Sequence, residues 1–239
     1  MLGLLGDIED YNNAGALIGL DATDNNELLG ALRKMNPIKR QRMINKLSSS
    51  GMPSRGSRAE MEKHFAELPS YIKDGLAKGE LRLADTVIYS IKLVNSKTIK
   101  LFETQDDKQI GLRNISNAKL PKNQALLVSG VFLLAGTAVD QTPDNIMATN
   151  FIGLESFPGL ATGETDLKAN KKQIFPETSN AVFKTGNYHN TPLGYYKLAN
   201  PRVILDDILI ELTVQLGTTT GIPNNTFLYA GLHGTITTP

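Results

Sequence analysis

The hydrophobic period of the chain changes near residue 80, and this change limits the folds open to it. Residues 1–80 have the pattern of helices, whereas residues 82–239 have the pattern of short strands separated by Pro, Gly and Asn turns. The sequence therefore predicts an N-terminal helical arm over residues 1–80 and a β domain over residues 82–239. A β domain of that size needs no disulfide or metal to stabilise its core.

Helix start and stop signals are clear in the first segment. Asp24 is a good N-cap, and the pair Asn36-Pro37 is typical of the start of a second helix. Ser57 is expected to cap a third helix. A short fourth helical segment, SYIKDGLAKG, should end on Gly79, because glycine is common after a helix C-terminus.

From Leu83 the period is two. One face of the first strand should carry Val87, Tyr89, Ile91 and Leu93. The turn residues Asn95-Ser96 followed by KTIKLF predict a hairpin. Residues 124–135 are apolar on both faces, so this strand should be covered on both sides, within the domain or at a subunit contact. Its two expected faces are Leu126, Val128, Phe132 and Leu134 against Leu127, Val131 and Leu133.

The rest of the β domain has weaker signals in its middle and strong ones at its end. Short strands are expected near 147–153, 172–176 and 181–185. A half-buried strand should place Ile208, Ile210, Leu212, Val214 and Leu216 on one face, and TFLYAGLHGTITT should form a final strand. The expected fold class is mainly β: a single jelly roll or β-sandwich of about eight strands with an N-terminal α-helical arm.

Composition excludes several kinds of protein. The chain has no cysteine, so it forms no disulfide and no cysteine-ligated metal site. The absence of tryptophan removes the usual platform for stacking sugars. The longest apolar run, ALLVSGVFLLAG at 125–136, is too short for a membrane-spanning helix, and the opening MLGLLGDIED does not match a secretory signal.

Catalytic motifs are absent from the sequence. There is no HExxH, no GxSxG and no phosphate-binding GxxxxGK[ST], and His64, His189 and His233 lie far apart. A triad assembled in space around His189 or His233 stays open. We expect no enzyme activity, no catalytic residue, no cofactor and no metal. The acids in loops or at the start of a strand match no calcium loop: Asp140, Asp144, Glu155 and the pair Asp206-Asp207.

The arm contains two opposed charge blocks beneath an overall formal charge of +1. Residues 1–30 contain acids and no Lys or Arg: Asp7, Glu9, Asp10, Asp21, Asp24 and Glu27. Residues 31–58 contain no acid, and their cations are the candidate contacts to an anion such as nucleic acid or lipid: Arg33, Lys34, Lys39, Arg40, Arg42, Lys46, Arg55 and Arg58. These cations have two open roles: binding phosphates or anionic lipid, or pairing with the acidic block within one chain or between neighbours. No aromatics interleave with them, so contacts to nucleic acid would not be sequence-specific.

The chain resembles the jelly-roll capsid proteins of icosahedral viruses, particularly small tailless bacterial viruses. The features that carry the resemblance are the arm with ALRKMNPIKRQRMINKL ahead of the β domain, the middle loops rich in Thr, Asn and Pro, and the ending NPRVILDDILIELTVQL…NTFLYAGLHGTITT. The resemblance implies a structural virion protein that self-assembles into a closed shell in the host cytoplasm. The capped helices and acidic start favour contacts of the arm with neighbouring subunits.

The expected partners follow from this resemblance. They are copies of the chain and other virion proteins, with genome or an internal membrane reached through the basic arm, and no small-molecule substrate. Two other functions stay open. One is a nucleic-acid- or membrane-surface-binding protein that uses residues 31–58, and the other is a glycan-binding β-sandwich module.

Overall fold

The computed structural model describes residues 36, 61, 63–185 and 191–239. Among these, Pro69–Arg82 belongs to one compact unit, while residues 61, 63–68 and Leu83–Thr238 belong to another. The helices expected to begin at Asp24, Asn36 and Ser57 lie outside the described residues, apart from Asn36 itself and the end of the third segment.

The first described unit contains helix α6 (Ser70–Lys78). The helix ends at Gly79, which has φ of +75° and donates its backbone N–H to the carbonyls of Gly75 and Leu76. Glycine adopts this left-handed conformation without the steric cost that a Cβ would add. The prediction that this segment ends on Gly79 is therefore confirmed.

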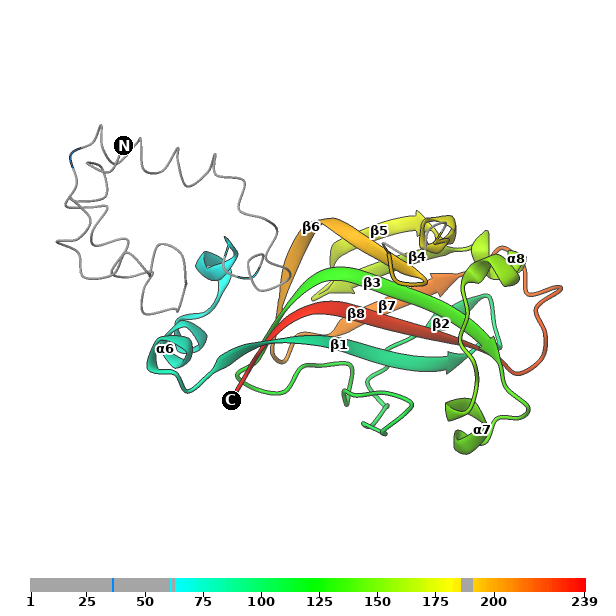
Figure 1. Cartoon of the computed structure of the whole chain (residues 1–239), viewed down its shortest axis with the longest axis horizontal. Coiled ribbons are helices and arrows are strands. Elements are labelled where there is room, and N and C mark those ends of the chain that lie inside the picture. The colour runs from blue at the N-terminus through cyan, green and yellow to red at the C-terminus, as the bar shows by residue number, and fades with distance from the viewer. Residues whose placement is uncertain (1–35, 37–60, 62, 186–190) are drawn as a thin grey trace. The chain divides into compact units, whose positions relative to one another are not determined.

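The second unit contains eight strands in two antiparallel sheets (Figure 1). The first sheet has the order β1-β8-β3-β6 and the second has the order β2-β7-β4-β5. The strands of the first sheet are β1 (Arg82–Leu93), β8 (Thr226–Thr238), β3 (Ala125–Thr137) and β6 (Tyr195–Leu205). Those of the second are β2 (Thr98–Lys100), β7 (Ile210–Gln215), β4 (Glu164–Ala169) and β5 (Lys172–Ser179). The prediction of a mainly β fold with about eight strands is confirmed.

The two sheets pack face to face across one hydrophobic core. Leu126 and Leu133 of β3 meet Leu212 of β7 in this core, and all three are fully buried. Facing side chains from two antiparallel sheets are the arrangement of a β-sandwich. The alternation predicted for 208–216 is confirmed, because its five apolar residues all pack in or against this core.

A bulge in β3 changes which side chains face the core. The register of β3 with both β6 and β8 shifts between Val128 and Gly130. Beyond the bulge, Val131 and Leu133 join Leu126 and Val128 in the core, whereas Phe132 lies on the opposite, outer face. The predicted grouping of Phe132 and Leu134 with Leu126 was wrong, because one extra residue in a strand reverses the faces that follow it.

The predicted hairpin at 87–102 is also wrong. β2 pairs with β7, through Ile99 opposite Val214, and it belongs to the other sheet from β1. In the connection, Val94 donates to Thr226 of β8 and Lys97 accepts from Leu216 just after β7. The chain therefore crosses from one sheet to the other where a tight return was expected.

The middle of the chain differs from its predicted strands. The 172–176 strand lies within β5 and is confirmed, but 181–185 largely overlaps a 3-10 helix, η3 (Asn180–Phe183). Residues 147–153 contain only one isolated bridge, from Ile152 to Ala135. The other short helices here are α7 (Pro143–Met147), η2 (Leu154–Ser156) and α8 (Pro158–Ala161). A tight hairpin joins β4 to β5 through Asn170 and Lys171, both with positive φ, as two-residue hairpin turns require.

Both faces of β3 are covered within a single chain. Leu126 on the core face and Leu127 on the outer face are each 0% exposed. Part of the outer cover is a small cluster in which Leu112 of the β2–β3 connection and Ile146 of α7 pack with Phe227 of β8. The two-sided apolar pattern of β3 therefore needs no second subunit to bury it.

Candidate functional site

The predicted catalytic and metal-binding candidates are separated in the structure. His64 pairs through Nδ1 with Oε1 of Glu67 at 2.9 Å, and His189 lies outside the described residues. His233 lies edge-on to the ring of Tyr195, with ring centroids 5.6 Å apart. Within the part of the chain that the structure describes, no group of three or more His, Cys, Asp or Glu side chains could hold a metal ion.

Two of the acids singled out in the sequence, Asp140 and Asp206, accept hydrogen bonds that hold turns in place. Asp206 accepts a hydrogen bond from the backbone N–H of Asn123 at 2.7 Å, and Asp207 follows it with φ of +57°. Asp140 accepts from both the backbone N–H and the hydroxyl of Thr142, just before α7. These bonds from Thr142 lower the pKa of the Asp140 carboxyl.

The candidate anion contacts of the arm lie outside the described residues. This holds for the whole set: Arg33, Lys34, Lys39, Arg40, Arg42, Lys46, Arg55 and Arg58. The role of these cations therefore stays a prediction.

Three exposed apolar side chains lie close in sequence to members of the small cluster on the outer face of the first sheet. Ile110 and Val139 are each 86% exposed and Met147 is 44% exposed. Each adjoins a buried member of that cluster, namely Leu112, Ala138 and Ile146. We call Ile110, Val139 and Met147 the apolar patch. Single exposed apolar residues are normal on a protein surface, whereas a contiguous group of them marks a candidate for a protein contact.

Hydrogen bonds hold the apolar patch in place. The side chain of Asn114 accepts from the backbone N–H of Tyr89 at 2.9 Å and donates to the carbonyl of Val87 at 2.8 Å, so the 109–114 segment is tied to β1. Asn225, just before β8, donates from its side chain to the carbonyl of Val139 at 3.2 Å. The patch therefore stands on segments anchored to the sheet.

An ion cluster fixes the same connection further along. Lys92 of β1 contacts Glu103 at 2.6 Å and Asp106 at 2.8 Å, and Arg113 approaches Asp106 at 3.5 Å. These side chains are only 13–30% exposed, so water screens them less than it screens an open surface pair. The cluster pins the β2–β3 connection that carries Ile110.

The sheet edges offer little to a pairing strand. Outer strands β6 and β5 each contain a proline, Pro201 and Pro176, which removes a donor from the free edge. The free edge of β1 is covered in part by Arg113, which bridges to Ser90. β2, the remaining edge strand, has only three residues. Such edges disfavour association by sheet extension, which leaves surfaces such as the apolar patch for contacts.

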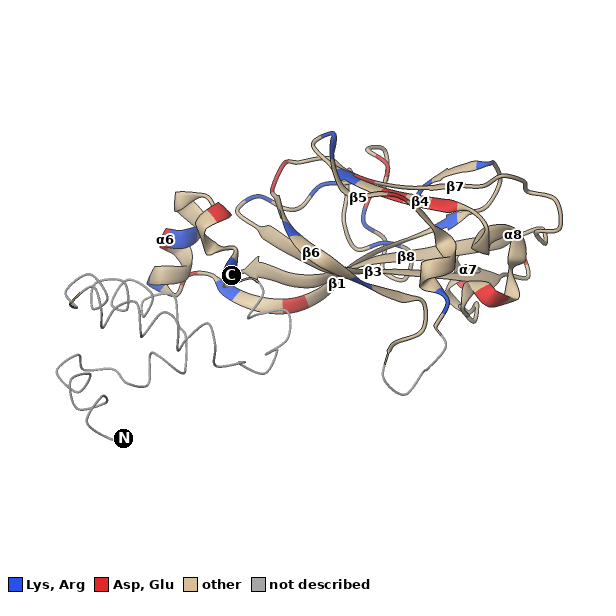
Figure 2. Ribbon diagram, turned by 90° about the horizontal axis from the view of Figure 1, so that it is seen from above, with Lys and Arg blue, Asp and Glu red and all other residues tan. Residues whose placement is uncertain are grey.

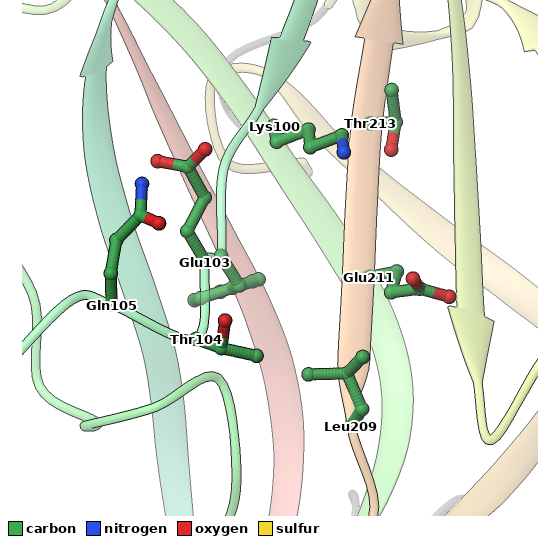
Figure 3. Close-up of a pocket in the computed structure, with 8 residues that line it drawn as sticks. Lys100, Glu103, Thr104, Gln105, Leu209, Glu211 and Thr213 are labelled. Atoms are coloured by element: carbon green, nitrogen blue, oxygen red, sulfur yellow. The ribbon is translucent and has the colours of Figure 1, made fainter.

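The outer face of the second sheet carries a polar hollow of about 240 Å³. Lys100 extends from β2 toward β7, while Glu103 and Gln105 rise from the connection after β2 (Figure 3). Thr104, together with Glu211 and Thr213 of β7, completes the polar lining. Because the hollow contains charges of both signs and lies open, it suits a polar side chain of a neighbour better than a buried apolar ligand.

Charge is distributed unevenly over the β domain (Figure 2). β3 and β8 contain no Lys, Arg, Asp or Glu, whereas β4, β5 and β7 all carry them. No helix among the described residues has the length and apolar character needed to cross a lipid bilayer.

Comparison with known proteins assigns this chain to no family. No protein-family model matches the chain, and no curated protein sequence matches it. Among solved structures, the chain is similar to the crystal structure of dimeric latent PorU from Porphyromonas gingivalis, with 16% sequence identity and a TM-score of 0.17. The match covers 64% of this chain and 12% of that one, and so low a TM-score carries no argument about fold or function.

Proposed function

We propose that this chain is a structural virion protein that self-assembles into an icosahedral capsid shell, with its β domain folded as a single jelly roll. The observation that carries the proposal is the pairing of the strands. The first strand pairs with the last, the second with the second to last, and so on inward: β1 with β8, β2 with β7, β3 with β6 and β4 with β5. These pairs alternate between the two sheets.

This alternation has a simple geometric origin. One long antiparallel hairpin, closed by the turn at Asn170 and Lys171, gives the same four pairs when it is wound around a core. Winding places successive pairs in opposite sheets, as expected for the double Greek key of the proposed jelly roll. Viral capsid proteins, lectins and cupins are among the proteins that use a jelly roll, so the strand order supports the proposal without selecting one of these functions.

The surface of the β domain supports self-assembly as the function within this proposal. Ile110 and Val139 are largely exposed on anchored segments, which suits a rigid contact between subunits. The prolines of β5 and β6 oppose uncontrolled edge pairing, a property that a protein packed at high concentration in a shell requires.

The arm supplies the second kind of contact in this proposal. Its acidic residues 1–30 and basic residues 31–58 have opposite charge, so the arm of one subunit can pair with that of a neighbour on the inner face of the shell. Such contacts are weakened by salt, because exposed charges are screened within about 10 Å at 0.1 M.

The test is electron microscopy of the full-length protein after overexpression. Closed shells or regular capsomers are expected at low salt, and shells should loosen as salt rises. A protein that stays a dilute monomer at every salt concentration, measured in parallel by light scattering, would contradict the proposal.

A further inference from the structure

We propose that the β domain has a phosphate-binding hollow that receives the backbone of a nucleic acid. We call it the basic hollow; its lining residues are Lys63, His64, Ala199, Asn200, Pro201 and Arg202. It goes beyond self-assembly, because it concerns what a subunit binds and not how subunits join.

The basic hollow forms where the segment ahead of α6 meets the edge strand β6. Lys63 and His64 come from that segment, Arg202 comes from β6, and the volume is about 290 Å³. Both parts belong to the same compact unit of the chain. A tight turn fixes the segment, because the backbone N–H of His64 donates to Met61 and that of Glu67 donates to His64.

The charged residues that line this hollow are cations, Lys63 and Arg202, and none of the six lining residues is an acid. The carboxylate of Glu67, which is not among the lining residues, is bonded to His64. The polar hollow on the second sheet differs, because there Lys100 lies with Glu103 and Glu211. Of these two hollows, the basic one has the charge that suits an anion.

The side chains match a phosphate better than a simple carboxylate. The guanidinium of Arg202 presents several N–H donors in a plane, the geometry that bidentate phosphate contacts use. The amide of Asn200 adds a neutral donor. Glu67 engages Nδ1 of His64 at 2.9 Å, which orients the ring, and Nε2 donates to a phosphate oxygen when the ring carries both protons.

The position of the hollow along the chain favours a strand of phosphates over a single ion. Lys63 follows the basic residues 31–58 after a short segment that contains Glu60 and Glu62, so the hollow lies close in sequence to the cations of the arm. A nucleic acid held by the arm would reach the hollow at high effective concentration. A recess on a folded domain suits a flexible phosphate chain, whereas a bilayer presents a flat surface.

The experiment measures the affinity of the full-length chain for a fluorescent 30-nucleotide single-stranded DNA by anisotropy from 50 to 300 mM NaCl. The test variant is Lys63→Gln with Arg202→Gln. The control variant, Lys122→Gln with Lys172→Gln, removes the same charge from exposed positions elsewhere in the β domain. Because each lost phosphate contact on a single strand lowers the slope of log K against log salt by about 0.7, the test variant should lose roughly 1.4 from that slope. That corresponds to roughly a 10- to 30-fold weaker affinity at 100 mM NaCl.

Several results would overturn the inference. The first is an absence of DNA binding by the unmodified chain at 50 mM NaCl, and the second is an equal loss of DNA affinity in the test and control variants. Binding to vesicles containing phosphatidylserine is measured in parallel, and the third is a test variant that binds these vesicles more weakly but binds DNA as the unmodified chain does. Thermal unfolding of both variants checks that they fold, and His64→Gln, expected to weaken binding only severalfold, gives a second probe if they do not. Light scattering of the same samples reports assembly separately, so failure of this inference is distinct from failure of the shell proposal.

Discussion

The two sheets of the β domain bury their inner faces alike but treat their outer faces differently. The outer face of the β1-β8-β3-β6 sheet is apolar and aromatic, and parts of the same chain cover it: Tyr229 stacks on Tyr89 at 5.6 Å and Phe151 packs against Tyr229. The outer face of the β2-β7-β4-β5 sheet is charged, with Asp166 and Lys168 joined at 2.9 Å.

This difference shows that an apolar outer face can be buried within one subunit, without a contact between subunits. Apolar residues on both faces of β3 do not by themselves indicate an oligomer, because the chain buries Leu127 itself. Exposed apolar residues remain where that cover ends, at Ile110, Val139 and Met147. We therefore assign the proposed self-association to the apolar patch and not to the buried face of β3.

The largest predicted effect compares truncation to alanine on the two outer faces. Leu127→Ala should lower the free energy of unfolding by about 2–5 kcal/mol, because it removes a fully buried side chain and leaves a cavity. Thr213→Ala, on the half-buried outer face of the second sheet, should cost at most about 1 kcal/mol. Urea unfolding of both variants is the measurement, and similar losses would erase the distinction between the faces.

A smaller effect is expected at the bulge of β3. The ring of Tyr195 occupies the place that a Cβ on Gly130 would take, so Gly130→Ala should cost about 1–3 kcal/mol. Gly217→Ala is the control, because its Cβ would meet nothing within 4 Å. In a Tyr195→Ala background the cost of Gly130→Ala should fall to about 1 kcal/mol or less. An unchanged cost in that background would show that the aromatic ring is not the obstacle.

The smallest effects concern alkaline pH, where the two faces raise pKa values for different reasons. Burial, with a further contribution from Tyr89, raises the pKa of Tyr229. A hydrogen bond to Asp166, followed by the charge of that residue, raises the pKa of Lys168. A raised folded-state pKa gives stability that is complete below the ordinary value, about 10 for either group, and is lost as pH rises through the folded pKa.

Salt distinguishes the two causes. In 1 M NaCl the attraction between the partly exposed Lys168 and the buried Asp166 is partly screened, so the pKa of Lys168 should move part of the way back toward the ordinary value, whereas the burial of Tyr229 persists. The titration of Tyr229 is measured as the part of the tyrosinate absorbance that is lost in the Tyr229→Phe variant. The titration of Lys168 is measured by NMR, and the Lys168→Met variant identifies its signal. Equal salt sensitivity of both groups would contradict the assigned causes.

The sequence was informative where one face of a strand meets the core. The alternation at 208–216 predicted the buried side of β7 correctly, and Gly79 marked the end of α6. In β3 a strict period of two failed, since the extra residue at Ser129-Gly130 reversed the faces beyond it. A glycine inside an apolar strand is the available signal of such a bulge.

Long-range pairing is what the sequence did not reveal. The residues at 94–97 suit a hairpin turn as well as a crossover, and only the pairing of β2 with β7 decides between them. The same holds for the apolar patch and for the basic hollow, whose residues are brought together by distant segments. Isolated apolar residues such as Ile110 and Val139 have no periodic pattern that would mark them.

The central claim is that the chain assembles through the apolar patch, and the most direct test is particle mass. Light scattering coupled to size exclusion would compare the unmodified chain with Ile110→Asp combined with Val139→Asp, and with a control that adds the same charge in an exposed loop, Thr219→Asp combined with Thr220→Asp. The account predicts large particles for the unmodified chain and the control, and a folded species of monomer or small-oligomer mass for the patch variant. Large particles from the patch variant, or a monomer from the unmodified chain, would contradict it.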